Sequence, residues 1–502
     1  MGLGYHVKAL HERTQGEACL LVFEPNMDVL AAALFTVDLS DVLGSGRCVI
    51  LTRLDKDYLH RHFEPHGTLM MLGMHFVSHP ASEQVAGAFH RAARAAVTDY
   101  ISYARMGLVT LVANSRITCR NVANNLPTYL STPPINVLRN RFADLPAVIV
   151  SAGPSIGRNI EQLIRLQDRA VLIAVQTMLK PLLRRGVRPH FVTSLDFHEI
   201  SKSFFEGLEP EAVADTHLVA EPKATWHVID AYPGMISLLD NAFARLCVGD
   251  ELAARDGLKA GATVAHLSYY LAEYMGCNPI IFVGQDLAYS DNAFYTPGVA
   301  IHDTWRPELN RFNTIEMKEW ERIVRHRSIL RKVKDIHGHE IYTDDALFTY
   351  LQQFESDFAR SRSRIIDATE GGVRKTGAAA MPLAEAADRF CTAPLPAECF
   401  DYRRQVTWRD DQRLRPGREA IVRRIDEVRC MRKQSAECLA VLKELVTLTD
   451  RPEAFNRKLA RVDDLRAQIE QQPDVYEMVS MMAQHAEPVS YTHLTLPTIY
   501  SV

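Results

Sequence analysis

The sequence predicts an α/β protein whose central domain is a doubly wound, mostly parallel sheet. From residue 147 onward, short apolar runs that carry no charge alternate with amphipathic helical segments. This alternation is typical of parallel βαβ units, in which helices cover both faces of the sheet. We expect strands at residues 147–150, 170–175, 190–194, 216–220 and 279–283, and helices at residues 156–166, 178–185 and 264–274. Ligands of such sheets bind beyond the carboxyl ends of the strands, which directs attention to the residues that follow each run.

The length of 502 residues predicts about two to four domains. We expect an N-terminal α/β domain over residues 1–140, with strands at 20–23 and 48–51 and a helix at 83–103. Pro133 and Pro134 mark its end, and the central domain follows over residues 141–397. Apolar residues then recur every three or four positions, which predicts an antiparallel helical hairpin over residues 398–488.

Both ends of the chain have unusual sequences. Gly2 and Gly4 flank a turn that would ordinarily follow a strand, so we expect that the native N-terminus is missing. Residues 489–502 break with the charged helical sequence before them and resemble translated sequencing adapter. We therefore expect a non-native tail and exclude it from the prediction of the fold.

Composition and charge exclude several classes of function. The net charge of −4 predicts no bulk attraction to nucleic acid or to an anionic membrane. No apolar run is long enough for membrane insertion, and charged residues interrupt any signal peptide. The nine cysteines form no CxxC pair, which favours a reducing cytoplasm and argues against a zinc site. The oligomeric state is left open.

The first strand of the central domain leads into a corner that is suited to a phosphate group. Gly153 permits a tight turn, Pro154 stiffens it, and Ser155 can cap the following helix, which contains Asn159. Backbone N–H groups at such a helix start bind anions. Neither a Walker A loop nor GxGxxG is present, so P-loop hydrolysis and a standard dinucleotide site are not expected. An ordinary βα turn explains the same residues, and the residue types leave the two interpretations evenly balanced.

Polar residues also follow the other predicted strands. Gln176 and Thr177 follow the second strand, Asp196 the third, Glu221 the fourth and Asp286 the last. Each residue alone is more typical of a helix cap, but together they favour a single binding crevice.

Two later glycine-containing segments are further candidates for the site. His339 follows Gly338 in a polar stretch, where a mobile loop over the crevice is expected, although a lone loop histidine is more often solvated surface. Residues 367–372 (DATEGG) are typical of turns and could pack near the same site. A turn that only connects two elements is the simpler interpretation.

Five motifs together resemble the motility accessory factor (Maf) flagellin glycosyltransferases. They are SAGPSIGRN at 151–159, TSLD at 193–196, VGQDLAY at 283–289, GHEIYTD at 338–344 and DATEGG at 367–372. The resemblance spans roughly residues 1–395 in order. It implies cytoplasmic transfer of pseudaminic or legionaminic acid from a CMP donor to serine or threonine of flagellin.

The central domain is more distantly similar to bacterial sialyltransferases that use CMP-sialic acid without a metal or other cofactor. This similarity implies His339 as the base, with Gly261 and Thr263 in a donor-binding segment before a helix. Tyr289 is the nearest aromatic hydroxyl for the departing CMP, and Asp286 is expected to orient sugar or ribose hydroxyls. The chain departs from that pattern in having three residues between His339 and Thr343, and Gln176 where an asparagine would contact the donor.

The candidate site therefore has two groups of residues. The catalytic candidates are His339, Tyr289 and Asp286; the candidates for donor binding are Ser151, Gly153, Pro154, Ser155, Asn159, Gln176, Thr177, Asp196, Gly261 and Thr263.

Two alternatives stay open. The central domain also resembles archaeal (MptE-like) 6-hydroxymethylpterin diphosphokinase, which would use ATP and Mg²⁺ on Asp196 and Asp286. The other alternative is a non-catalytic scaffold that binds flagellin through the helical hairpin.

Overall fold

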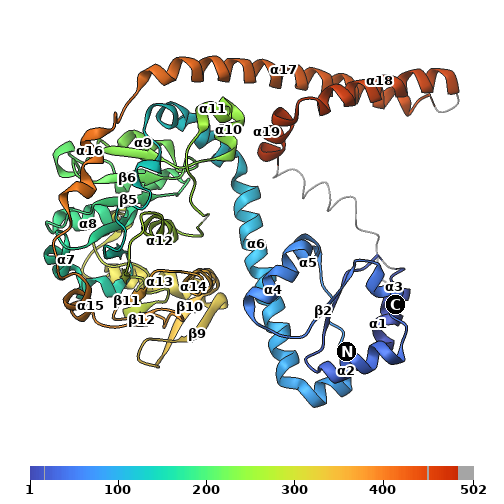
Figure 1. Cartoon of the computed structure of the whole chain (residues 1–502), viewed down its shortest axis with the longest axis horizontal. Helices are drawn as coiled ribbons and strands as arrows, with labels where there is room; N and C mark the ends of the chain where they lie inside the picture. Colours follow the sequence, from blue (N-terminus) through green and yellow to red (C-terminus); the bar gives the residue numbers. More distant parts are fainter. Residues whose placement is uncertain (16, 260, 449–450, 484–502) are drawn as a thin grey trace. The chain divides into compact units, whose positions relative to one another are not determined.

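The computed structural model describes residues 1–15, 17–259, 261–448 and 451–483 (Figure 1). It has two compact units, residues 1–114 and the chain from residue 115 onward. The division falls inside helix α6 (Pro80–Ser131), and not near residue 140 as predicted from the prolines. The helix predicted at 83–103 is part of this longer helix. The tail predicted at 489–502 lies outside the described residues.

The first unit is a two-stranded parallel sheet between two layers of helices. Strand β1 (Leu20–Phe23) pairs with β2 (Cys48–Leu51), so both strands have the predicted bounds. Alternate residues enter two cores because successive side chains of a strand point to opposite faces: Val22 packs with one, and Phe23 with the other. The helices are α1 (Tyr5–Arg13), α2 (Met27–Thr36), α3 (Ser40–Gly44), α4 (Lys56–Phe63) and α5 (Gly67–Leu72), with the 3₁₀ helix η1 (Glu64–His66).

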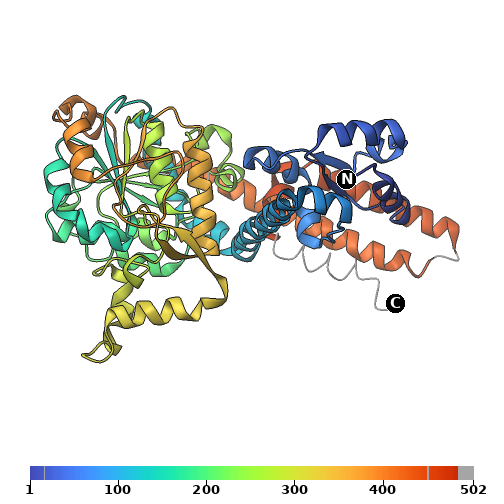
Figure 2. The same cartoon turned by 90° about the horizontal axis from the view of Figure 1, so that it is seen from below.

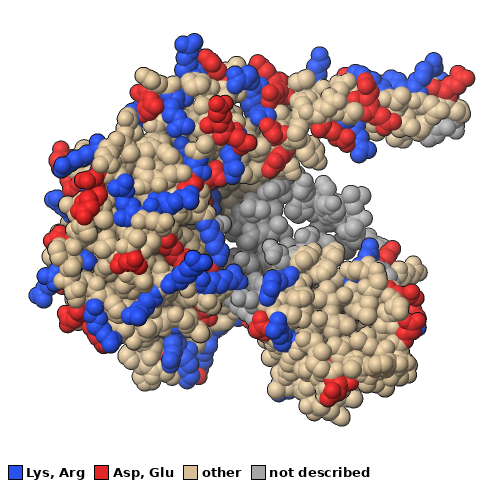
Figure 3. All heavy atoms as spheres, in the orientation of Figure 1, with Lys and Arg blue, Asp and Glu red and all other residues tan. Residues whose placement is uncertain are grey.

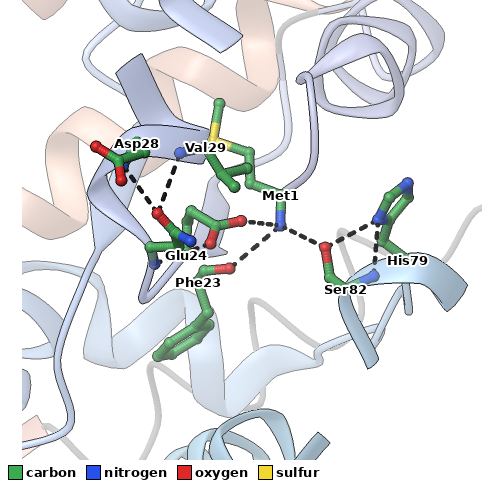
Figure 4. Close-up of polar contacts among 8 residues, drawn as sticks. Met1, Phe23, Glu24, Asp28, Val29, His79 and Ser82 are labelled. Carbon is green, nitrogen blue, oxygen red and sulfur yellow. Dashed lines mark hydrogen bonds and ion pairs between the residues drawn. The ribbon is translucent and has the colours of Figure 1, made fainter. Parts of the chain in front are cut away.

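The first residues of this unit lie at the carboxyl end of β1 (Figure 4). The Met1 amino group is 3.0 Å from Glu24 Oε2 and 3.4 Å from both the Phe23 carbonyl and Ser82 Oγ. Gly2 and Gly4 have φ values of 55° and 84°, which L side chains rarely adopt. This unit also contains a cavity of about 630 Å³ lined by α1, β1, residues 73–79 and the start of α6.

The second unit is built on an eight-stranded parallel sheet, which confirms the predicted fold class (Figure 1). Its order is β12-β11-β8-β3-β4-β5-β6-β7. The strands are β3 (Ala147–Val150), β4 (Val171–Val175), β5 (Phe191–Ser194), β6 (His217–Ala220), β7 (Met235–Leu238), β8 (Ile280–Val283), β11 (Ile365–Asp367) and β12 (Ala379–Ala380). All residues of β3, β4 and β8 are buried, as expected for apolar runs covered on both faces.

Helices cover both faces of this sheet. In β5, Phe191 joins one core with helix α12 (Val264–Tyr274), and Val192 joins the other core with the end of α6. The bounds of α12 agree with the prediction. The helix predicted at 156–166 is instead the 3₁₀ helix η3 (Pro154–Arg158) followed by α7 (Ile160–Leu166). The break is at Asn159, whose side chain donates to the Ala368 carbonyl at 3.0 Å.

The other helices of the sheet domain lie between or after its strands. They are η2 (Ile135–Leu138), η4 (Gln176–Met178), α8 (Leu179–Arg184), η5 (Glu199–Phe204), η6 (Pro210–Ala212), α9 (Trp226–Ala231), α10 (Ala242–Val248), α11 (Asp250–Ala253), η7 (Ser290–Asn292), η8 (Ala300–Glu308), α13 (Ile315–Arg325), η9 (Arg327–Ile329), α14 (Asp345–Phe358), α15 (Leu383–Phe390), η10 (Ala397–Phe400), α16 (Tyr402–Gln405) and η11 (Asp411–Arg413). The helix predicted at 178–185 corresponds to α8.

A segment that the sequence did not predict lies between β8 and β11. It contains α13 and an antiparallel hairpin of β9 (Leu330–Lys334) and β10 (Glu340–Asp344). Figure 2 shows this yellow segment projecting from the layer of parallel strands. The charged residues of β9 explain why a pattern of apolar runs did not identify it.

The helical hairpin predicted after residue 398 is confirmed. Helix α17 (Leu414–Leu445) pairs with α18 (Pro452–Glu470), and α19 (Pro473–Ala483) follows. The pairing is antiparallel, since Glu437 binds Arg461 and Glu444 binds Lys458. Figure 3 shows acidic and basic side chains interspersed along these helices. None of the described helices combines the length and apolarity that a membrane span requires.

Candidate functional site

The strand order creates a switch point between β3 and β8. The chain runs outward from β3 through β4, β5, β6 and β7, and then returns to β8 on the other side of β3. In doubly wound sheets, ligands bind in the crevice that such a reversal opens at the carboxyl ends of the strands. Six of the predicted site residues lie at this position, directly after β3 or β8: Ser151, Gly153, Pro154, Ser155, Asp286 and Tyr289.

The corner after β3 is packed directly against the end of β8. The Gly153 N–H donates to the Gly284 carbonyl at 2.8 Å. Ser155 donates twice to Asp286, from Oγ to Oδ2 at 2.6 Å and from its backbone N–H to Oδ1 at 3.3 Å. Ser155 is 1% exposed and Asp286 is 2% exposed. Burial raises the pKa of Asp286, although the hydrogen bonds from Ser155 oppose this shift.

These contacts change the role that the corner can have. The backbone N–H of Ser155 is bound by a carboxylate of the protein itself, so a phosphate at this position would compete with Asp286. A Cβ atom on Gly153 would lie 2.0 Å from Asp286 Oδ2, so only glycine fits there. Phosphate binding by Ser151, Gly153, Pro154 and Ser155 stays a prediction.

The DATEGG segment packs on the other side of Asp286. The Val373 N–H donates to the Asp286 carbonyl at 2.8 Å, and a Cβ on Gly372 would lie 2.3 Å from the same oxygen. A buried ion pair between Lys375 Nζ and Asp367 Oδ2, 2.9 Å long, holds the segment in place. The segment therefore lies beside Asp286, near the candidate site. Its contact with Asp286 is made by backbone atoms.

The ends of β4 and β5 supply the next pair of polar residues. The Gln176 side chain donates to the carboxylate of Asp196 and accepts a hydrogen bond from Ser194 Oγ at 2.6 Å. Burial raises the pKa of Asp196, while the charges of His198 and Lys223 oppose the shift. Gln176 is buried, whereas Asp196 and Thr177 are half-buried. The exposed edge of this pair is thus suited to contact a ligand.

The start of α12 lies beside the end of β5. Thr193 Oγ1 donates to the Val264 carbonyl at 3.4 Å, and Thr263 Oγ1 accepts from the His266 N–H at 3.3 Å as the helix cap. A Cβ on Gly261 would lie 2.8 Å from His266 Cβ. Gly261 and Thr263 are half-buried. The bond from Thr193 to Val264 places the start of α12 beside β5, the strand that Asp196 follows.

Tyr289 contacts a residue that sequence reasoning did not assign. Its hydroxyl donates to Asp344 Oδ2 at 2.5 Å, and Asp344 Oδ1 caps α14 by accepting from the Leu347 N–H at 2.8 Å. Burial, and then the bond to Asp344, raise the pKa of Tyr289. Asp344 closes the GHEIYTD motif, so the motif itself is the signal that could have identified it.

Two further tyrosines lie close to these carboxylates. Burial raises the pKa of Tyr295 to about 12, and the nearby charge of Asp196 acts in the same direction. Burial also raises the pKa of Tyr350, with contributions from Asp344 and Asp196. Both tyrosines are half-buried.

His339 is not brought together with the other candidates. It lies in the turn between β9 and β10 with its side chain 81% exposed. Its Nδ1 is 3.6 Å from Asp335 Oδ2, and its backbone N–H donates to Asp335 Oδ1 at 2.8 Å. The assignment of His339 as a base stays a prediction that requires movement of the hairpin.

Two asparagines of α6 position the loops after β5 and β6. Asn121 Nδ2 donates to the carbonyls of Phe197 and Lys223, at 2.9 and 3.1 Å. Asn125 Nδ2 donates to the carbonyls of Pro222 and Ala224, at 2.9 and 2.8 Å. The sequence offers only a weak signal for them, namely two amides one helical turn apart on an apolar face.

Neither metal ligation nor a disulfide is indicated within the described part of the chain. No group of three or more His, Cys, Asp or Glu side chains there could hold a metal ion. The nine cysteines are all free thiols, and burial raises the pKa of several of them, including Cys119 to about 11.

Comparisons with known proteins agree with this architecture. The family described as 6-hydroxymethylpterin diphosphokinase MptE-like matches residues 120–292. The solved structure of a Maf glycosyltransferase from Magnetospirillum magneticum AMB-1 has a TM-score of 0.55 at 16% sequence identity, covering 98% of this chain and 77% of that chain. The chain has the fold of a Maf glycosyltransferase. The fold implied by the sequence motifs is therefore confirmed. No curated protein matches the chain in sequence.

The family match covers a smaller part of the chain than the structural match. Residues 120–292 begin within α6 and end just after Tyr289, so they contain the corner after β3 and the end of β8. The β9–β10 hairpin and the DATEGG segment lie beyond this match. The Maf glycosyltransferase structure covers them as well, since its alignment spans almost the whole chain.

Proposed function

We propose that this protein is a cytoplasmic glycosyltransferase that moves a nonulosonic acid from its CMP donor to serine or threonine hydroxyls of flagellin. Pseudaminic and legionaminic acid are the proposed sugars. The fold shared with a Maf glycosyltransferase supports the class of enzyme, and the motifs in residues 151–159, 283–289 and 338–344 support the donor and acceptor. The proposed transfer inverts the anomeric carbon and uses no metal or other cofactor.

The observation that carries the proposal is the bond between Tyr289 and Asp344 beside the switch point. In the transfer, the bond from the anomeric carbon to the CMP phosphate oxygen breaks and a bond to the acceptor oxygen forms. Negative charge develops on the departing phosphate, and a fixed hydroxyl donor stabilises it. The Tyr289 hydroxyl is protonated at neutral pH, and burial raises its pKa further. Because it has a single hydrogen, we propose that this hydrogen turns from Asp344 Oδ2 to the phosphate oxygen when the CMP-sugar binds.

The donor-binding residues have separate proposed roles. The start of α12, with Gly261 and Thr263, offers backbone N–H groups to the phosphate, as helix starts do for anions. Asp196 and Thr177 are half-buried beside it and orient hydroxyls of the ribose or the sugar. The proton of the acceptor hydroxyl passes to His339, which reaches the crevice when the hairpin closes.

The test is a transfer reaction with purified components. Unmodified flagellin is incubated with this protein and CMP-pseudaminic or CMP-legionaminic acid, in the presence of a metal chelator, and its intact mass is measured. A mass increase of one nonulosonic acid residue, together with release of CMP, is expected. Release of CMP at an unchanged flagellin mass, or no release with either donor, contradicts the proposal.

A second candidate function rests on the family match to residues 120–292. A 6-hydroxymethylpterin diphosphokinase would transfer diphosphate from ATP and hold Mg²⁺ on Asp196 and Asp286. A thermal-shift comparison of CMP with ATP and Mg²⁺ separates the two functions, since a ligand that binds only the folded protein raises its Tm. Stabilisation by ATP and Mg²⁺, with none by CMP, favours the diphosphokinase. Tight flagellin binding with neither nucleotide favours a scaffold.

A further inference from the structure

A short segment after β8 crosses the corner at the end of β3. We name residues 293–302 the strap. The Thr296 N–H donates to the Ala152 carbonyl at 2.9 Å, which ties the strap to the corner next to Gly153. Tyr295 of the strap is half-buried and is influenced by the charge of Asp196. The strap therefore lies at the candidate site, although no motif of the sequence pointed to it.

A single buried carboxylate holds both ends of the strap. Glu319, on the inner face of α13, is 1% exposed. Its Oε2 accepts from the Phe294 N–H at 2.7 Å, and its Oε1 is 2.8 Å from Nε2 of His302, which is 3% exposed. Two hydrogen bonds to one buried carboxylate are strong, because burial removes the competition of water.

Aromatic contacts connect the strap to Tyr289, the proposed hydrogen-bond donor to the departing phosphate. The ring of Phe294 lies 5.9 Å from the ring of Tyr289, and Arg322 of α13 stacks 4.2 Å above Phe294. The Glu319 bond to the Phe294 backbone thus fixes the residue that packs against Tyr289. His302 is fixed in turn by stacking on Trp305, at 5.2 Å between ring centroids.

We infer that Glu319 is a positioning residue, which holds the strap and its Tyr295 at the CMP-binding crevice through its bonds to Phe294 and His302. This inference rests on the proposed function for the identity of the ligand, but the attachment of the strap is independent of it. Glu319 itself contacts neither the donor nor the acceptor. Its removal frees the strap, weakens donor binding and leaves the sheet intact.

The first measurement is hydrogen exchange followed by mass spectrometry on Glu319→Ala, Glu319→Gln and wild type. Faster exchange in residues 293–302 of Glu319→Ala is expected, with unchanged exchange in β3 and β8. Glu319→Gln keeps a side-chain oxygen for the Phe294 N–H, so its exchange lies between the other two. The matched control is Glu321→Gln, because Glu321 lies on the same helix, is 49% exposed and pairs with Arg325.

The second measurement separates positioning from a merely structural role. The Kd for CMP and the KM for the CMP-sugar are expected to rise about tenfold in Glu319→Ala, with a smaller change in kcat and partial rescue in Glu319→Gln. Strap exchange equal to wild type, or faster exchange in β3 and β8 as well, overturns the inference. If wild type binds no CMP, the proposed function fails, and the exchange data still decide whether Glu319 holds the strap.

Discussion

Ser155 donates its hydroxyl hydrogen to Asp286 Oδ2 at 2.6 Å, although the two residues are 131 positions apart in the sequence. The bond joins the ends of the two central strands at the point where the strand order reverses. The backbone of Gly372 approaches Asp286 from the other side. Three segments that resemble family motifs therefore converge on one carboxylate, which organises the corner instead of leaving it open.

This convergence predicts a strong effect of a single methyl group at Gly153. In Gly153→Ala the new Cβ would lie 2.0 Å from Asp286 Oδ2 and 2.5 Å from the Gly284 carbonyl, so the corner must shift. We expect a loss of about 1–3 kcal/mol in the free energy of unfolding, measured with urea. The control is Gly157→Ala, where the added Cβ meets nothing within 4 Å. Equal stability of the two variants would show that the corner is loosely packed.

The sequence predicted the central strands and α12 because uninterrupted apolar runs leave little choice of structure. It missed β11 (Ile365–Asp367), which is too short to show a pattern, and β9, whose residues are mostly charged. It also placed a continuous helix at 156–166, since nothing local reveals that Asn159 bonds to Ala368. The local signals were sufficient where burial was continuous and failed where a distant partner decided the conformation.

The candidate site was predicted in position more than in detail. The rule for strand ends located Gln176, Asp196 and Asp286, which the structure places at the expected edge. It could not show that Asp286 binds Ser155, nor that Asp344 and not His339 contacts Tyr289. Those pairings depend on the folding of segments that are far apart in the chain.

The raised pKa of Asp286 predicts a pH dependence of stability. Its ordinary value is 3.8, and burial raises it, so the folded protein favours the neutral acid. The stability that Asp286 contributes is fully present below pH 3.8 and is lost as the pH rises through the raised value. The difference in unfolding free energy between wild type and Asp286→Asn should therefore shrink as the pH rises above 3.8 and through the raised pKa. A difference that grows with pH would mean that the carboxylate form is favoured in the folded state.

Removing the hydroxyl of Tyr289 tests its role at the departing phosphate. Tyr289→Phe keeps the ring but loses the donor to Asp344 Oδ2, and we expect transfer to slow by about 10²–10³-fold, as for other donors that stabilise developing charge. CMP affinity should change much less. Tyr342→Phe is the matched control, because Tyr342 lies on β10 and is exposed. If both variants transfer sugar at the same rate, Tyr289 does not act on the leaving group.

His339→Ala decides whether the β9–β10 hairpin takes part in the reaction. With its side chain 81% exposed, His339 adds little to the fold, so the free energy of unfolding should change by less than about 0.5 kcal/mol. If the hairpin closes to bring His339 to the acceptor as a base, transfer should slow by about 10²–10⁴-fold while CMP affinity is retained. His337→Ala serves as the control, since His337 lies in the same exposed turn. A normal rate in His339→Ala would remove His339 from the mechanism, and a base would then have to come from the carboxylates that already line the crevice.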